Sequence, residues 1–442
     1  MEILRRLKKD AVTRNKLLAT IAILFLLLIG YRVPLPGINT DYLDGVLASF
    51  TNSGVGGFMN TLTGSSLETM SVFALSITPY ITASILLQLL TVIVPSLEAM
   101  SKDGSVGKQK MERLTFFVGA IIAIIESLGL AIGFGRNGLF VTYTWYMVLY
   151  TIVVWTAGAC FLIWVGQTIT NKLIGNGISM ILLFNILTTL PGDISNIFST
   201  ISNGYEWWDK ILIGIAMAFI VCLVFAYVVV LETAEKRIAI TNSAKSGIRM
   251  SGANNNVMPI KLSSGVMPII FSSSIMSIPT IIVQFVGVEE GSIWAKIANC
   301  MNQGNWFHLH DPWNTLGVLL FIPLTFAFAY FYSVISFNTK DIADNLRKSG
   351  SIINGIRPGQ PTADYLNHQA KSMLWIGTSM LLLIALLPAV ISGIFEIGSL
   401  SFSGTTIIII VSVILEMKNT VSAQTSSVAY KSLIKKNRRN AL

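Results

Sequence analysis

The most informative part of the chain is residues 66–93, which read Ser66-Leu-Glu-Thr-Met-Ser-Val-Phe-Ala-Leu-Ser-Ile-Thr-Pro-Tyr-Ile-Thr-Ala-Ser-Ile-Leu-Leu-Gln-Leu-Leu-Thr-Val-Ile93. The stretch is long enough to cross about 30 Å of hydrocarbon. It carries Pro79, which frees a backbone carbonyl inside a helix, and Gln88, whose amide needs a partner away from water. We therefore expect a membrane helix that faces protein or water on one side.

The composition indicates that most of the chain lies in a membrane. Of its 442 residues, 53% are hydrophobic and only 12% are charged, whereas soluble proteins carry about 25% charged residues. The charges are missing from runs of about 20 residues, which is the length of a membrane-spanning helix. There are ten such runs, at residues 17–33, 72–94, 115–134, 145–168, 178–201, 211–231, 265–286, 315–336, 373–392 and 400–415. The fifth is interrupted by Pro191-Gly-Asp193, and the tenth is short and rich in Ser and Thr.

Lysine and arginine alternate between the loops that connect these runs. The two ends of the chain and every second loop hold 27 of the 31 basic residues, and the other loops hold only Arg32, Arg136, Lys210 and Lys296. Because basic loops stay in the cytosol, we expect a multi-pass protein of the plasma membrane with both termini cytosolic. The net charge of +9 then reflects topology and attraction to anionic lipids, not nucleic-acid binding.

The expected fold class is all-α: a polytopic membrane protein with ten transmembrane helices in two pseudo-symmetric inverted halves of five. The N-terminal half would cover residues 1–205, and the C-terminal half would cover residues 206–442, with cytosolic loops at 232–264 and 337–372 and a basic tail at 416–442. Inverted halves also build secondary transporters, which hold their solute with charged or polar ligands at the midplane. Here the polar residues within the runs are Gln88, Glu126, Gln167 and Asn185, and no two carboxylates lie at helical spacing within one run.

Several segments resemble the SecY/Sec61 family of protein-conducting channels, in the family's order. The segments are Pro79-Tyr-Ile-Thr-Ala-Ser84 with Gln88-Leu-Leu90 for the second helix, Val55-Gly-Gly-Phe-Met-Asn-Thr-Leu-Thr-Gly-Ser-Ser66 for the plug, Gly166-Gln-Thr-Ile-Thr-Asn-Lys-Leu-Ile-Gly-Asn-Gly-Ile-Ser179 for the entry to the fifth helix, Gly265-Val-Met-Pro-Ile-Ile-Phe-Ser-Ser-Ser-Ile275 for the seventh helix, and Ala343-Asp-Asn-Leu-Arg-Lys-Ser-Gly350 with Gly355-Ile-Arg-Pro-Gly359 for the loop before the ninth.

The resemblance implies four groups of site residues. The apolar pore ring falls on Ile77, Ile81, Ile178, Leu182, Ile270 and Ile409. The plug falls on Phe58, Met59, Asn60, Thr61, Leu62, Thr63 and Gly64. Polar positions at a lateral gate are Gln88, Ser273 and Ser274, and docking residues for a motor or ribosome are Arg357, Lys236 and Arg237. Branched alkyl groups offer water and ions no hydrogen bonds, so a narrow ring of them resists conduction.

The resemblance also implies a function: the central pore subunit of a Sec translocase, a passive channel and not an enzyme. It would conduct unfolded polypeptides and release hydrophobic segments sideways into the lipid. Expected partners are SecE-like and SecG-like small membrane subunits, the SecA motor, the ribosome and preproteins with signal sequences. We expect no cofactor, because Gly133-Phe-Gly-Arg-Asn-Gly138 has a dinucleotide-binding spacing but no strand before it. We expect no metal, because His308, His310 and His368 do not form a set of metal ligands.

Three departures from the family keep alternatives open. The family usually has Gly at the position of Ser76 and an acid at the position of Gln167, and its version of the 232–264 loop is richer in basic residues. A specialised accessory paralogue of SecY is therefore one alternative, and a secondary transporter of small solutes is another.

Overall fold

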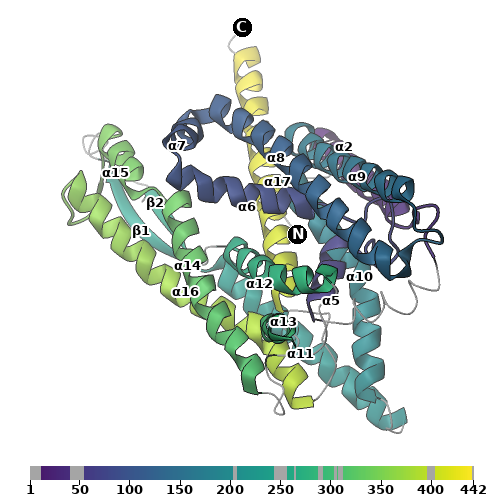
Figure 1. Ribbon diagram of the computed structural model, residues 1–442. Helices are drawn as coiled ribbons and strands as arrows, with labels where there is room; N and C mark the ends of the chain where they lie inside the picture. Colours follow the sequence, from purple (N-terminus) through teal and green to yellow (C-terminus); the bar gives the residue numbers. More distant parts are fainter. Residues whose placement is uncertain are drawn as a thin grey trace.

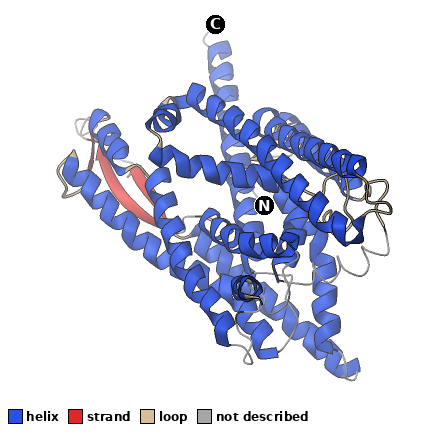
Figure 2. Cartoon of the chain, in the orientation of Figure 1, coloured by secondary structure: helices blue, strands red, loops and turns tan. Residues whose placement is uncertain are grey.

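The computed structural model describes residues 11–39, 54–202, 207–242, 256–262, 265–286, 292–302, 306, 312–395 and 404–440. In this part of the chain, long helices make up most of the molecule, and a small β-sheet lies at one side of it (Figure 2).

The long helices follow the predicted runs. They are α2 (Ala11–Tyr31), α6 (Thr78–Ile93), α8 (Gly104–Phe134), α9 (Trp145–Lys172), α10 (Gly177–Ser202), α11 (Trp207–Thr233), α12 (Met267–Val286), α14 (Leu316–Ser336), α16 (Gln360–Phe395) and α17 (Gly404–Asn440). Shorter ones are α5 (Gly54–Thr63), α7 (Pro95–Lys102), η2 (Gly135–Leu139), α13 (Ile293–Met301), η5 (Pro312–Thr315) and α15 (Thr339–Lys348). Each predicted run overlaps one long helix, although α10 continues through Pro191, where a break was expected.

Within the described ranges, eight helices are long and apolar enough to cross a membrane, or nine if the bent pair α6 and α7 counts as one span. The apolar segment of α12, Met267–Thr280, is shorter. Outward faces carry large apolar side chains: Leu212, Phe219 and Val230 of α11 are 70%, 68% and 68% exposed. Such a surface suits hydrocarbon and not water. The prediction of a polytopic helical membrane protein is therefore confirmed, and the division into two inverted halves stays a prediction.

The second predicted span begins later than expected. Residues 64–77 run mainly through turns, and Ser65, Met70 and Ser76 have φ angles of 62°, 44° and 49°. Pro79 lies in the first turn of α6, where its missing N–H has no helical partner in any case. The expectation that Pro79 frees a carbonyl in mid-helix was therefore wrong. After α6 the chain bends by 105° into α7 and returns through α8 (Figure 1).

The two segments predicted as cytosolic loops contain a sheet that the sequence analysis missed. Strands β1 (Glu235–Asn242), β2 (Asn256–Lys261) and β3 (Ser351–Ile353) pair antiparallel in the order β2-β1-β3. Its buried residues Ile238, Ile260 and Ile353 form a cluster with Leu366 of α16. The sheet lies beside α15 and α16 at the edge of the helical body (Figure 1). The fold is thus all-α except for this sheet.

Candidate functional site

The predicted ring residues come from four segments of the chain and meet in two neighbouring apolar clusters. The first cluster contains Leu182 of α10, Ile270 of α12 and Ile409 of α17. The second contains Ile77, which immediately precedes α6, and Ile178 of α10 packs against it. Ile81 packs against both clusters and so links them.

Four of the six predicted ring side chains are buried, and Ile81 and Ile178 are half-buried. The exposed fraction is 0% for Ile77, 2% for Ile409 and 4% for Ile270, while Leu182 is 7% exposed. Each of the six predicted ring side chains is Ile or Leu, so they offer no hydrogen-bonding group to water or to an ion. They therefore suit the apolar constriction that the resemblance implies, and their role as a pore ring stays a prediction.

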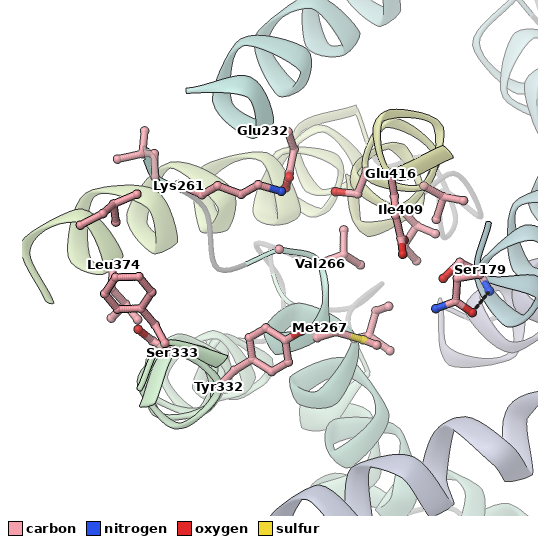
Figure 3. A pocket seen from close by; sticks show the side chains of 18 of the residues that line it. Ser179, Glu232, Lys261, Val266, Met267, Tyr332, Ser333, Leu374, Ile409 and Glu416 are labelled. Atoms are coloured by element: carbon pink, nitrogen blue, oxygen red, sulfur yellow. Dashed lines mark hydrogen bonds between the residues drawn. The ribbon is translucent and has the colours of Figure 1, made fainter. Parts of the chain in front are cut away.

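A cavity of about 600 Å³ leads to the constriction from the side of the β-sheet, and Leu182, Ile270 and Ile409 form part of its wall. Strand β2 contributes Pro259, Ile260 and Lys261 to the same wall. Charged residues line another part of it: Figure 3 shows Lys261 pointing toward Glu232, with Glu416 beside Ile409. The cavity therefore passes from a polar wall to an apolar end.

The short helix α5 packs against α10, the helix that carries Leu182. Leu62, near the end of α5, belongs to the cluster that holds Leu182, Ile270 and Ile409. Thr61, Leu62, Thr63 and Gly64 are buried, and Met59 and Asn60 are half-buried. Phe58 lies in α5 as well, but its side chain is outside the described part. The described part of the segment predicted as the plug is therefore mostly a helix that packs against α10, and its role as a plug stays a prediction.

A polar contact joins α5 to α10. Nδ2 of Asn185 donates hydrogen bonds to the carbonyl oxygen of Leu62 at 3.0 Å and to Oγ of Ser76 at 2.9 Å. The hydroxyl of Tyr31 lies 3.4 Å from the same Oγ. The sequence singled out Asn185 and Ser76 separately and did not connect them. A buried amide in an apolar run requires a hydrogen-bond partner, and this requirement was the sequence feature that could have indicated a contact for Asn185.

The predicted gate residues lie on α6 and α12. Nε2 of Gln88 donates to Oγ of Ser84, one turn earlier in its own helix, at 3.0 Å. Ser273 is buried in α12, and Ser274 is half-buried and accepts a bond of 2.7 Å at its carbonyl from Oγ of Ser277. Helix α12 packs against α14 and α8, so it lies where the two predicted halves of the chain meet.

The predicted docking residues are exposed and lie on the unit formed by the sheet and α16. Arg357 occupies the turn between β3 and α16, and its carbonyl accepts a bond from Oγ1 of Thr362 at 2.8 Å. Lys236 and Arg237 project from β1, where Arg237 forms an ion pair of 2.9 Å with Glu235. Because β1 pairs with β3, the structure brings these two distant segments together.

These features define a class: a polytopic helical membrane protein with a cavity that is lined by charged residues and by buried Ile and Leu side chains, and with a short helix packed against α10. Comparison with known proteins is more specific. The SecY family model matches residues 71–418, and the chain belongs to the SecY family.

Curated relatives cover nearly the whole chain. The protein translocase subunit SecY of Corynebacterium glutamicum is 33% identical, covering 97% of this chain and 98% of that protein. That of Staphylococcus epidermidis is 34% identical and covers 95% and 96%. Among solved structures, "The structure of a protein conducting channel" superposes with a TM-score of 0.66 at 18% identity, over 95% of this chain and 94% of that one. "Sec61 in the Canine ribosome-channel complex from the endoplasmic reticulum" gives 0.63 at 17%, with the same coverage.

Proposed function

We propose that this chain is the pore subunit of a protein translocase, a passive channel that conducts unfolded polypeptides across the plasma membrane. The observation that carries the proposal is the apolar constriction between the cavity and α5. Curated relatives that cover nearly the whole chain are named for protein translocation, which supports it further.

The constriction suits this task for two physical reasons. Alkyl side chains exclude water and ions from a narrow passage, so the pore stays tight when it is empty. They also adapt to any translocating side chain without binding it through hydrogen bonds, so passage does not depend on sequence. In this mechanism α5 leaves its place against α10 when a polypeptide enters, and Leu62 leaves the apolar cluster that also holds Leu182, Ile270 and Ile409.

Release into lipid would occur between α6 and α8 on one side and α12 and α14 on the other. Gln88, Ser273 and Ser274 are the polar positions proposed for this gate. A signal sequence is itself an apolar helix, so it moves sideways into hydrocarbon without losing hydrophobic stabilisation.

The charge distribution supports an orientation in which the sheet, the cavity mouth and both termini face the cytosol. Arg357, Lys236 and Arg237 then lie on the cytosolic surface, where the SecA motor or the ribosome would dock. SecE-like and SecG-like subunits would cover part of the exposed apolar helix faces, and anionic lipids would contact the basic cytosolic loops.

A secondary transporter would need polar ligands at its narrowest point. The constriction described here is formed by Ile and Leu, so the channel is favoured. A specialised accessory paralogue would share the same pore and differ in its partners.

The test is photo-crosslinking with a stalled secretory precursor. A photoreactive residue at Ile270, which lies in the constriction, should capture the precursor. The matched control is Ile278 on the same helix, which is 47% exposed and should capture lipid. Equal capture of lipid at both positions, with no precursor at Ile270, would contradict the proposal.

A further inference from the structure

Asn185 places a polar amide at a buried position of an apolar helix, which costs free energy unless the amide is hydrogen-bonded. It is 1% exposed in the middle of the apolar helix α10. Its two Nδ2 protons are both used, one on the carbonyl of Leu62 and one on the hydroxyl of Ser76. The last four carbonyls of a helix have no partner within that helix, and the Leu62 carbonyl is among them. Asn185 therefore caps the C-terminal end of α5 from a different helix.

Ser76 is unusual for its backbone. Its φ of 49° lies in the left-handed region, which glycine adopts freely and a residue with a Cβ adopts at a cost. A glycine would relieve that strain, but it would remove the hydroxyl that accepts from Asn185 at 2.9 Å and lies 3.4 Å from the Tyr31 hydroxyl. The side chain therefore connects α10 to α2 at the expense of local backbone strain.

The backbone at the end of α5 fits closely against this network. Gly64 has a φ of 68°, and a Cβ on it would lie 3.2 Å from Cα of Asn185. The chain thus turns out of α5 directly against the residue that caps it. Moving α5 off the constriction must break the Asn185–Leu62 bond and leave a buried donor without its partner.

We propose that Asn185 and Ser76 are positioning residues that hold α5 in the closed channel and thereby set how strong a signal sequence must be to open it. The inference rests on the proposed function, because it takes α5 as the element that closes the pore. A signal helix opens the channel only by binding the open state better than the closed one, so each bond that favours the closed state raises the required affinity.

The test uses Asn185→Ala, Ser76→Gly and the double variant in reconstituted vesicles. The readouts are ion leak and translocation of a precursor with a weakened signal. Loss of one or two bonds of ordinary strength shifts an equilibrium by about five- to thirtyfold, and we expect Asn185→Ala to raise both readouts by about that factor. Ser76→Gly should raise them less, because it leaves the bond to Leu62. Because Ser76→Gly also relieves backbone strain, we expect this variant to fold, so the inference can be tested even if Asn185→Ala is poorly expressed.

Ser76 acts on α5 only through its bond to Asn185, so the double variant should equal Asn185→Ala alone. Independent, additive effects would show that the two residues do not work together and would overturn the inference. The matched control is Thr189→Ala, since Thr189 is 6% exposed on the same helix but donates its hydrogen bond within that helix, to the carbonyl of Ile186 at 3.1 Å. A leak in Thr189→Ala equal to that in Asn185→Ala would mean that any polar truncation in α10 opens the pore, and would also overturn it.

A deletion separates this inference from the function on which it rests. In a channel without residues 58–64, Asn185→Ala should have no further effect on leak, because its partner on α5 is gone. If the deletion raises leak but Asn185→Ala alone does not, the positioning role is wrong and the channel function stands. If the deletion does not raise leak and Ile270 does not crosslink to a precursor, the proposed function itself fails.

Discussion

Nζ of Lys236 on β1 donates a hydrogen bond of 2.5 Å to Oε1 of Gln369 on α16. With the pairing of Ile240 and Ile353 between β1 and β3, this bond joins two segments that are more than a hundred residues apart into one unit. Arg357 lies in the turn that connects β3 to α16. A partner that binds one of these segments therefore also meets the other.

Arg357→Glu should reduce motor-driven translocation by about tenfold or more, measured with SecA and ATP in reconstituted vesicles. A guanidinium pairs with a carboxylate or phosphate through two parallel bonds, and the glutamate would repel the same group. Arg357→Lys keeps the positive charge but cannot form the two parallel hydrogen bonds of a guanidinium, so its translocation rate should be intermediate.

The control for this prediction is Arg347→Glu. Arg347 is also exposed, but it lies on α15 and pairs with Asp344 at 3.5 Å. Surface changes of this kind usually alter stability by less than about 0.5 kcal/mol, so expression and assembly should be normal in both variants. A normal rate in Arg357→Glu would remove this residue from the coupling mechanism.

Deletion of residues 58–64 should raise ion leak while export of ordinary precursors continues. The deletion removes Leu62, which belongs to the same apolar cluster as Leu182, Ile270 and Ile409, but it leaves the ring side chains in place to close around a translocating chain. Conductance of reconstituted channels, with and without a precursor, measures both effects. An unchanged leak would mean that α5 does not seal the pore.

Ile409→Asn should let precursors with defective signals through. Ile409 is 2% exposed within the constriction, and an amide there would hold water in a region that otherwise excludes it. Ile409→Leu, which keeps the volume and the apolar character, is the matched control and should behave like the original chain. The measurement is the ratio of export with a defective signal to export with an intact one.

Much of the helical architecture could be predicted from the sequence, because the length of an apolar run and the side of its basic loops are local properties. The start of α6 could not, since the left-handed backbone at Ser76 is held by contacts with Asn185 and Tyr31, which are distant in the chain. Pro79 was compatible with either the middle or the first turn of a helix, and only the preceding turns decide between them.

The sheet was missed although a signal was present. Ile238 and Ile240 are buried while Arg237, Ala239 and Thr241 are exposed, which is the alternation of a strand with one covered face. The surrounding segment is polar, and the partner strand β3 lies far away in the sequence. The sequence analysis therefore predicted a loop at 232–264 and no strand. The composition of the ring was predictable by resemblance, but its juxtaposition with Leu62 depends on tertiary packing.

Cysteine labelling should confirm the membrane orientation. In a chain without its native cysteines, Thr142→Cys should react with a membrane-impermeant reagent added to intact cells, because residues 137–143 are expected to lie outside. Ala239→Cys on β1 should react only after the membrane is opened, since the sheet is expected in the cytosol. Thr142 and Ala239 are both exposed in the structure, so a difference in labelling reports the side of the membrane and not burial within the protein. Labelling of residue 239 in sealed cells would reverse the orientation.

The last prediction concerns the close approach of α9 to the turn before α6. A Cβ on Gly158 would lie 2.3 Å from the carbonyl oxygen of Val72, which is too near for any side chain without backbone movement. Gly158→Ala should therefore destabilise the protein in detergent, with a thermal midpoint lower by several degrees, and by displacing the turn it should also raise ion leak. Gly192→Ala is the control, because Gly192 lies in α10 where no described atom comes within 4 Å of the position that a Cβ would take, and alanine favours a helix over glycine by about 1 kcal/mol. It should leave the midpoint unchanged or raise it slightly. A midpoint for Gly158→Ala equal to that of Gly192→Ala would show that α9 and the turn do not pack this closely.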